Sequence, residues 1–101
     1  MKKSNQSANM TSFHGTVINA SVNQLKQIVG EPEWSDNTGE DKTNFEWICE
    51  TESGEVVTIY DWKEYRSISE DEIIEFHLGG FSKSSTEDGK IELLNALSKL
   101  D

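Results

Sequence analysis

Two short segments of the chain hold side chains suited to binding a ligand. The first is Tyr60-Asp61-Trp62-Lys63, where two flat rings can stack on a base and Lys63 offers a point charge to a phosphate or carboxylate. In the alternative interpretation, the rings belong to the core, and Asp61 and Lys63 pair with neighbours at the end of a strand. The sequence leaves both interpretations open.

The second segment is His77-Leu78-Gly79-Gly80. An imidazole titrates near neutral pH and glycine backbone can present N–H groups to an anion, so this segment could bind charge or perform acid-base chemistry. Its alternative is a tight turn with a surface histidine. The candidate ligand-binding residues are therefore Tyr60, Asp61, Trp62, Lys63, His77, Gly79 and Gly80.

Few residues support catalysis or metal binding. His14 and His77 are the only histidines, and no segment has the spacing of a zinc motif or a calcium loop. The single cysteine, Cys49, lies in an apolar run, and no serine lies in a nucleophile-elbow context. The chain also lacks a phosphate-binding loop and a dinucleotide fingerprint. We therefore expect a non-catalytic protein without a metal or a cofactor.

The chain is strongly acidic, with 19 acidic and 9 basic residues and a net charge of −10. Residues 31–75 contain most of the acids and only three basic residues. Such a field disfavours direct binding to nucleic acid or to an anionic membrane. The acids either form a solvated surface, or they imitate a phosphate backbone and occupy the basic groove of a nucleic-acid-binding enzyme.

The candidate segments need strands to position them, and the hydrophobic pattern predicts four. Residues 55–62 form the longest β-branched and aromatic run and are expected to be a central strand. Thr51-Glu52-Ser53-Gly54 is a turn that joins this strand to the preceding one as an antiparallel hairpin. The predicted strands cover residues 13–20, 45–50, 55–62 and 73–78. If the last strand pairs with the central one, both candidate segments can lie on one side of the sheet.

Two helices are predicted from their end signals. Ser21 and Gln24 form a capping box at the start of the first helix, and Gly30 followed by Pro32 ends it. The predicted N-cap of the second helix is Ser84 or Ser85. Its predicted apolar face consists of Ile91, Leu93, Leu94, Leu97 and Leu100.

The resulting order of elements, β-α-β-β-β-α, predicts an α+β fold. We expect an antiparallel sheet of about four strands with two helices packed on one face. Residues 1–12 are polar and are predicted to be a disordered N-terminal tail, and residues 13–101 to be a single α+β domain. No segment approaches the roughly 20 apolar residues that span a bilayer, and the lone cysteine suits a reducing compartment, so we expect a cytosolic protein, in the cytoplasm.

Residues 13–97 resemble a family of small proteins found in tailed phages and prophages. The matching segments are Gly15-Thr16-Val17-Ile18-Asn19-Ala20, Leu25 with Gly30-Glu31-Pro32, Asp41-Lys42, Glu46-Trp47, Thr58-Ile59-Tyr60-Asp61-Trp62-Lys63 and Phe76-His77-Leu78-Gly79-Gly80. The Tyr-Asp-Trp-Lys and His-Leu-Gly-Gly pieces are the specific ones. The resemblance implies a phage setting, in which small non-catalytic proteins often act against host defence.

We therefore expect a phage-type binding protein that counteracts a host pathway by sequestering a small phosphorylated or nucleotide ligand. A homo-oligomer is expected, because one small sheet face rarely encloses a nucleotide alone. The alternative is an acidic inhibitor that mimics nucleic acid and blocks a host defence protein such as a nuclease or a CRISPR complex.

Overall fold

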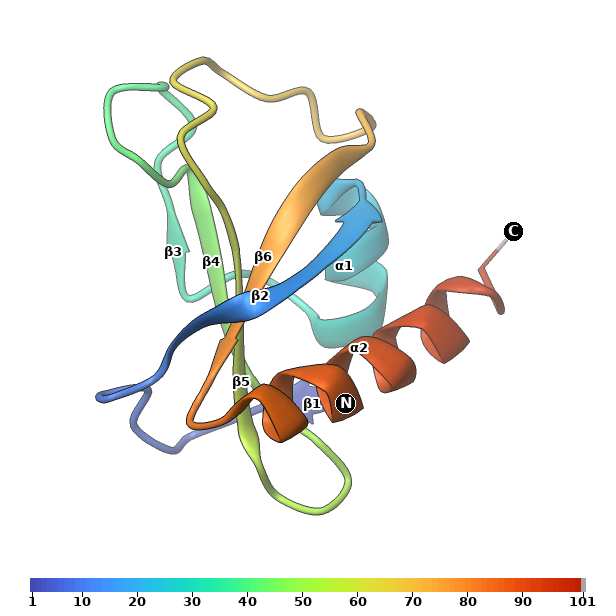
Figure 1. Ribbon diagram of the computed structural model, residues 1–101. Coiled ribbons are helices and arrows are strands. Elements are labelled where there is room, and N and C mark those ends of the chain that lie inside the picture. The colour runs from blue at the N-terminus through green and yellow to red at the C-terminus, as the bar shows by residue number, and fades with distance from the viewer. Residues whose placement is uncertain (101) are drawn as a thin grey trace.

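The computed structural model describes residues 1–100 and contains six strands and two helices (Figure 1). In chain order, the elements are β1 (Lys2–Lys3), β2 (Ser12–Ala20), α1 (Val22–Val29), β3 (Trp34–Ser35), β4 (Phe45–Glu50), β5 (Val56–Asp61), β6 (Ile74–Gly80) and α2 (Lys83–Leu97). Residue 101, at the end of the predicted domain, lies outside the described residues.

The strands form one antiparallel sheet in the order β1-β4-β5-β6-β2, and β3 also pairs with β4. This confirms the predicted α+β fold with an antiparallel sheet and two helices. The prediction of about four strands is wrong, because β1 and β3 add two more. Each of them has only two residues, which is too short to show the alternation that identifies a strand in sequence.

The two short strands cover the outer edge of β4. Between them, the backbone N–H of Ser4 donates to the carbonyl of Ile48 over 3.0 Å. The Glu33 carboxylate accepts the N–H of Ile48 over 2.9 Å. An edge strand with unpaired N–H and C=O groups invites pairing with other chains. In this protein, short segments and one side chain occupy those groups on β4.

The first twelve residues differ from the disordered tail that the sequence predicts. Lys2 and Lys3 pair with Glu50 and Cys49 of β4, and the side chain of Met1 packs against the core. The polar composition of this segment misled the prediction, because pairing with an edge strand uses backbone groups that every residue has. The segment therefore contributes to the sheet.

The local predictions around α1 and the hairpin are confirmed. Ser21 is the N-cap of α1 and forms a capping box with Gln24, and Gly30 ends the helix with a φ of 84°. β4 and β5 pair antiparallel, with Cys49 opposite Val57. Each of these features depends on residues close together in sequence.

α2 begins and packs differently from its prediction. Its N-cap is Ser82, whose hydroxyl accepts the N–H of Ser85, so the predicted caps at Ser84 and Ser85 lie inside the helix. Ile91 and Leu94, two of the five predicted apolar-face residues, are exposed. The helix instead buries small residues near its start, and among the predicted apolar residues only Leu93 is fully buried.

Both helices contribute to one core on the same face of the sheet, which we call the inner face (Figure 1). Trp47 and Phe76 pack edge to face there with ring centroids 5.9 Å apart, and Leu25 of α1 and Leu93 of α2 join the same cluster. The Trp47 indole donates to the carbonyl of Gly30 over 2.8 Å, which attaches the end of α1 to β4. Neither helix within residues 1–100 has the length and apolar character needed to cross a bilayer.

Candidate functional site

Four aromatic rings gather on the outer face of the sheet, the face opposite the helices. Tyr60 of β5 lies directly opposite His77 of β6, so the two side chains share this face. The His77 ring stacks on Phe13 at 4.0 Å between centroids and lies 6.1 Å from the ring of Trp62. Tyr60 meets His77 and Trp62 edge to face, at 5.6 and 6.0 Å. We call Phe13, Tyr60, Trp62 and His77 the aromatic cluster.

Two lysines flank the exposed ring of Trp62. The Nζ atom of Lys63 lies 5.6 Å from the ring centroid and that of Lys42 lies 5.7 Å from it. Both distances fit a cation–π contact. The backbone N–H of Lys63 donates to the carbonyl of Lys42 over 2.7 Å, which holds the two residues side by side. Lys63 also has a φ of 58°, a left-handed conformation that is strained for a lysine.

These lysines differ from four of the other seven basic residues of the chain. Four basic side chains lie against carboxylates, namely Lys3, Lys26, Arg66 and Lys83. Within the described part of the chain, neither Lys42 nor Lys63 forms an ion pair. An acidic protein thus keeps two uncompensated positive charges beside one tryptophan, where an anion can reach them.

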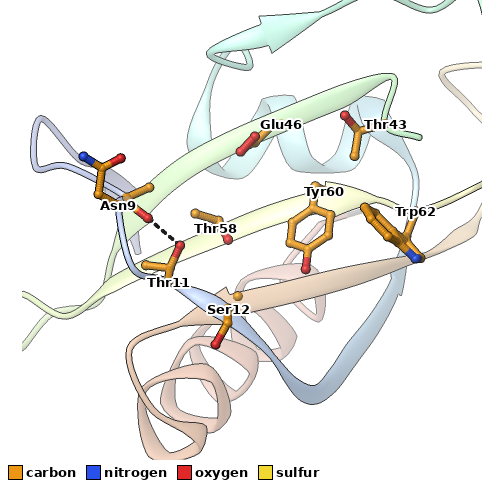
Figure 2. Close-up of a pocket in the computed structure, with 10 residues that line it drawn as sticks. Asn9, Thr11, Ser12, Thr43, Glu46, Thr58, Tyr60 and Trp62 are labelled. Carbon is orange, nitrogen blue, oxygen red and sulfur yellow. Dashed lines mark hydrogen bonds between the residues drawn. The ribbon is translucent and has the colours of Figure 1, made fainter. Parts of the chain in front are cut away.

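A pocket of about 400 Å³ lies beside the aromatic cluster. Figure 2 shows Thr58 and Tyr60 on β5 and Trp62 just past its end in a row, with Glu46 on the neighbouring β4. The remaining lining residues are Ala8, Asn9, Thr11 and Ser12 from the N-terminal segment, and Thr43 and Gly79. The segment predicted as a tail therefore forms one wall of the pocket.

The two titratable rings of the cluster are neutral near pH 7. Burial lowers the pKa of His77 below its usual 6.5, and the nearby Glu75 only partly opposes this. Burial, with a smaller effect of Glu46, raises the pKa of Tyr60 above 10. Positive charge at the site therefore comes from Lys42 and Lys63 and not from His77, which serves as a stacking ring.

Glu46 is the acidic residue of the pocket. It lies opposite Tyr60 on the outer face and is half-buried. Burial, helped by the charge of Glu33, raises the pKa of its carboxyl above 4.5. Within residues 1–100, no side-chain hydrogen bond or ion pair engages this carboxylate, and its oxygens are free to accept hydrogen bonds from a ligand.

Five of the seven residues predicted from sequence come together here. Tyr60, Trp62 and Gly79 line the pocket, and Lys63 and His77 contact the ring of Trp62. The structure places Gly79 inside β6, paired on both sides, and not in a turn. Gly79 is required there because it has no side chain: a Cβ atom at this position would lie 2.5 Å from the Thr58 hydroxyl.

Asp61 and Gly80 lie away from the site. Asp61 points to the inner face, is 1% exposed, and accepts the backbone N–H groups of Asn44 and Phe45. Gly80 also faces inward, since a Cβ atom there would lie 3.0 Å from Thr86 of α2. Successive residues of a strand point to opposite faces, so neighbours of Tyr60, Trp62 and Gly79 necessarily leave the outer face.

Sequence reasoning missed several contributors to the site. The predicted hairpin carried a usable signal for Lys42 and Thr43, because its register brings the start of β4 beside the end of β5. Phe13 and the N-terminal wall had no such signal. They reach the site through the pairing of β2 with β6, which joins residues more than fifty positions apart.

Comparisons of the chain with protein-family models, with curated proteins and with solved structures gave no match. Within residues 1–100, no group of three His, Cys, Asp or Glu side chains is arranged to hold a metal ion. Functional inference therefore rests on the aromatic cluster, the two lysines and the pocket beside them.

Proposed function

We propose that this chain is a non-catalytic binding protein that holds a small phosphorylated ligand with an aromatic base, such as a nucleotide. The observation that carries the proposal is the pair of lysines, neither of them in an ion pair, placed over the ring of Trp62. A base stacks on the exposed aromatic rings, and its phosphate meets the two ammonium groups beside them. Both contacts use chemistry that is already arranged on the outer face.

The overall charge of the chain strengthens this assignment. A net charge of −10 repels anions from most of the surface. Lys42 and Lys63 are then a local exception, and the left-handed backbone at Lys63 is consistent with a position maintained for binding. Stacking of a base on an aromatic side chain contributes about 1–3 kcal/mol. The pocket volume of about 400 Å³ falls within the usual range for small-ligand sites.

Two observations support binding without turnover. Burial raises the pKa of the Cys49 thiol to about 12, so the only cysteine stays protonated in the core. The ring of His77 is stacked between Phe13 and Trp62 and, among residues 1–100, forms no hydrogen bond to a hydroxyl or thiol that it could activate. A neutral, partly buried imidazole is suited to stacking more than to proton transfer.

The resemblance to phage proteins supplies a setting for this activity. In that setting, the protein sequesters a nucleotide on which a host defence pathway depends. We also propose that the protein is a homo-oligomer, since a second copy would close the open side of the pocket. Native mass spectrometry of the purified protein tests both points, and a monomer without any bound small molecule would count against them.

Calorimetry with a panel of linear and cyclic nucleotides tests the binding function. Trp62→Ala is expected to weaken binding about tenfold to a hundredfold through lost stacking. The double variant Lys42→Gln with Lys63→Gln should weaken it at least about tenfold, because hydrogen bonds to charged groups contribute about 1.5–3 kcal/mol each.

Matched controls exist for both variants. Phe81→Ala removes an exposed ring outside the cluster, and Lys99→Gln removes a charge beyond the end of α2. Both controls should bind as the wild type does. The proposal fails if no nucleotide binds, or if the site variants and the controls lose affinity equally.

A further inference from the structure

The pocket contains the carboxylate of Glu46, which is unfavourable for binding a phosphate. Glu46 contributes negative charge inside the pocket, while Lys42 and Lys63 stand beside Trp62 at one end of it. A phosphate is repelled by the first group and attracted by the other two. The ligand is therefore oriented, with its phosphate at the lysines and its base toward Glu46.

Glu46 is positioned to read the edge of a stacked base. It lies directly opposite Tyr60 in the β4–β5 pair and opposite Trp34 in the β3–β4 pair. Side chains opposite each other in an antiparallel pair are about 4.5–5.5 Å apart at Cβ. A base lying against Tyr60 thus presents its edge to a half-buried carboxylate whose oxygens have no partner among residues 1–100.

An ionised carboxylate accepts hydrogen bonds and donates none, which restricts the base. Guanine presents its ring N–H and its amino group side by side, matching the two oxygens of one carboxylate in a bidentate contact. Adenine and cytosine place an acceptor nitrogen beside their amino group. Uracil and thymine flank their single ring N–H with two carbonyl oxygens. Both of these arrangements turn an acceptor toward the carboxylate.

We infer that the ligand carries a guanine base, whose two adjacent N–H donors are accepted by Glu46. This inference rests on the nucleotide-binding function proposed above and adds the identity of the base. Thr43 and Thr58 line the same pocket and offer hydroxyl groups to the remaining polar atoms of the ligand.

Calorimetry on the full chain with guanosine, inosine and adenosine monophosphates, each in linear and cyclic form, tests the assignment. Inosine keeps the ring N–H and lacks the amino group, so it should bind about tenfold more weakly than guanosine, and adenosine about a hundredfold more weakly. Glu46→Gln should reduce the guanosine-to-adenosine preference at least about tenfold, because an amide can donate to adenine as well as accept from it.

Glu50→Gln is the matched control, since Glu50 lies on the same strand and face but outside this pocket. It should keep the wild-type preference. Equal affinity for guanosine and adenosine, or an unchanged preference in Glu46→Gln, would overturn the guanine assignment and leave nucleotide binding intact. Failure of the wild type to bind any of these compounds would overturn both, and the comparison of bases on the wild type requires no variant to fold.

Discussion

Asp61 links the start of β4 to the segment that follows β5 through its buried carboxylate. Its oxygens accept the N–H groups of Asn44 at 2.8 and 3.0 Å and of Phe45 at 2.8 Å. Asn44 in turn donates to the carbonyl of Arg66 over 2.7 Å. Burial raises the pKa of Asp61, while these backbone hydrogen bonds lower it. The residue therefore fixes the start of β4 and does not contact a ligand.

We expect Asp61→Ala to destabilise the fold. The substitution leaves two buried backbone N–H groups without an acceptor, at about 1–3 kcal/mol for each. Urea unfolding should show this loss in the free energy of unfolding. Asp41→Ala is the control, because Asp41 is an exposed acid in the same loop, and it should leave stability nearly unchanged. Equal effects of the two substitutions would contradict the structural role of Asp61.

His77 should make stability depend on pH. Burial lowers its folded-state pKa below 6.5, so its contribution is present above pH 6.5 and is lost as the pH falls through the folded-state value. We expect the wild type to lose more stability between pH 7.5 and pH 5 than His77→Phe, which keeps a ring stacked on Phe13. Urea unfolding at both pH values measures this difference, and equal losses in the two proteins would contradict it.

At the scale of elements, α2 approaches the sheet closely because small residues face it. Gly89 lies over Val57 of β5, and a Cβ atom at Gly89 would lie 3.0 Å and 3.1 Å from the two Val57 methyl groups. The hydroxyl groups of Thr16 and Thr86 share a buried hydrogen bond of 2.7 Å. The helix therefore docks through glycine and threonine, and this explains why Ile91 and Leu94 remain exposed.

Gly89→Val should destabilise the protein by about 1–3 kcal/mol through overpacking. Helix propensity alone favours the substitution, because glycine is poorer than valine in a helix interior. A lower free energy of unfolding would thus identify the close packing as the cause. Asn95→Val, at an exposed position of α2, is the control and should change stability little. A gain in stability for Gly89→Val would show that the helix does not pack this closely.

At the scale of the whole molecule, the N-terminal segment contributes both to the stability of the fold and to the candidate site. Met1 packs against the core, β1 pairs with β4, and Ala8 and Asn9 line the pocket. Deletion of residues 1–10 should lower the free energy of unfolding by about 1–3 kcal/mol and weaken ligand binding. Urea unfolding and calorimetry check the two effects. Unchanged values in both would match a disordered tail instead.

Several acidic residues form ion pairs within the protein, which matters for the alternative that the acidic surface mimics nucleic acid. Glu64 and Glu72 pair with Arg66, and Glu31 and Glu70 pair with Lys26. Together with buried Asp61, these acids account for part of the negative charge between residues 31 and 75. Inhibition of a nuclease by mimicry stays a prediction, and charge reversal of exposed acids such as Glu40 and Asp41 would test it.

The sequence by itself determined the features that depend on near neighbours. The capping box of Ser21 and Gln24, the end of α1 at Gly30 and the β4–β5 hairpin each form within a few residues, so local hydrogen bonding and backbone preference are sufficient. Tyr60, Trp62 and His77 could also be identified from the sequence. Side chains at alternate positions of a strand share one face, and rings on such a face stand out in a polar chain.

Only the tertiary structure decided which of these residues share a site. Pairing of β5 with β6 places Tyr60 opposite His77, and the two-residue period of a strand removes Asp61 to the other face. Phe13 and the N-terminal wall join through strand pairing across long separations, which no local pattern encodes. The recognition surface depends on those long-range backbone hydrogen bonds, and these exist only once the whole sheet has formed.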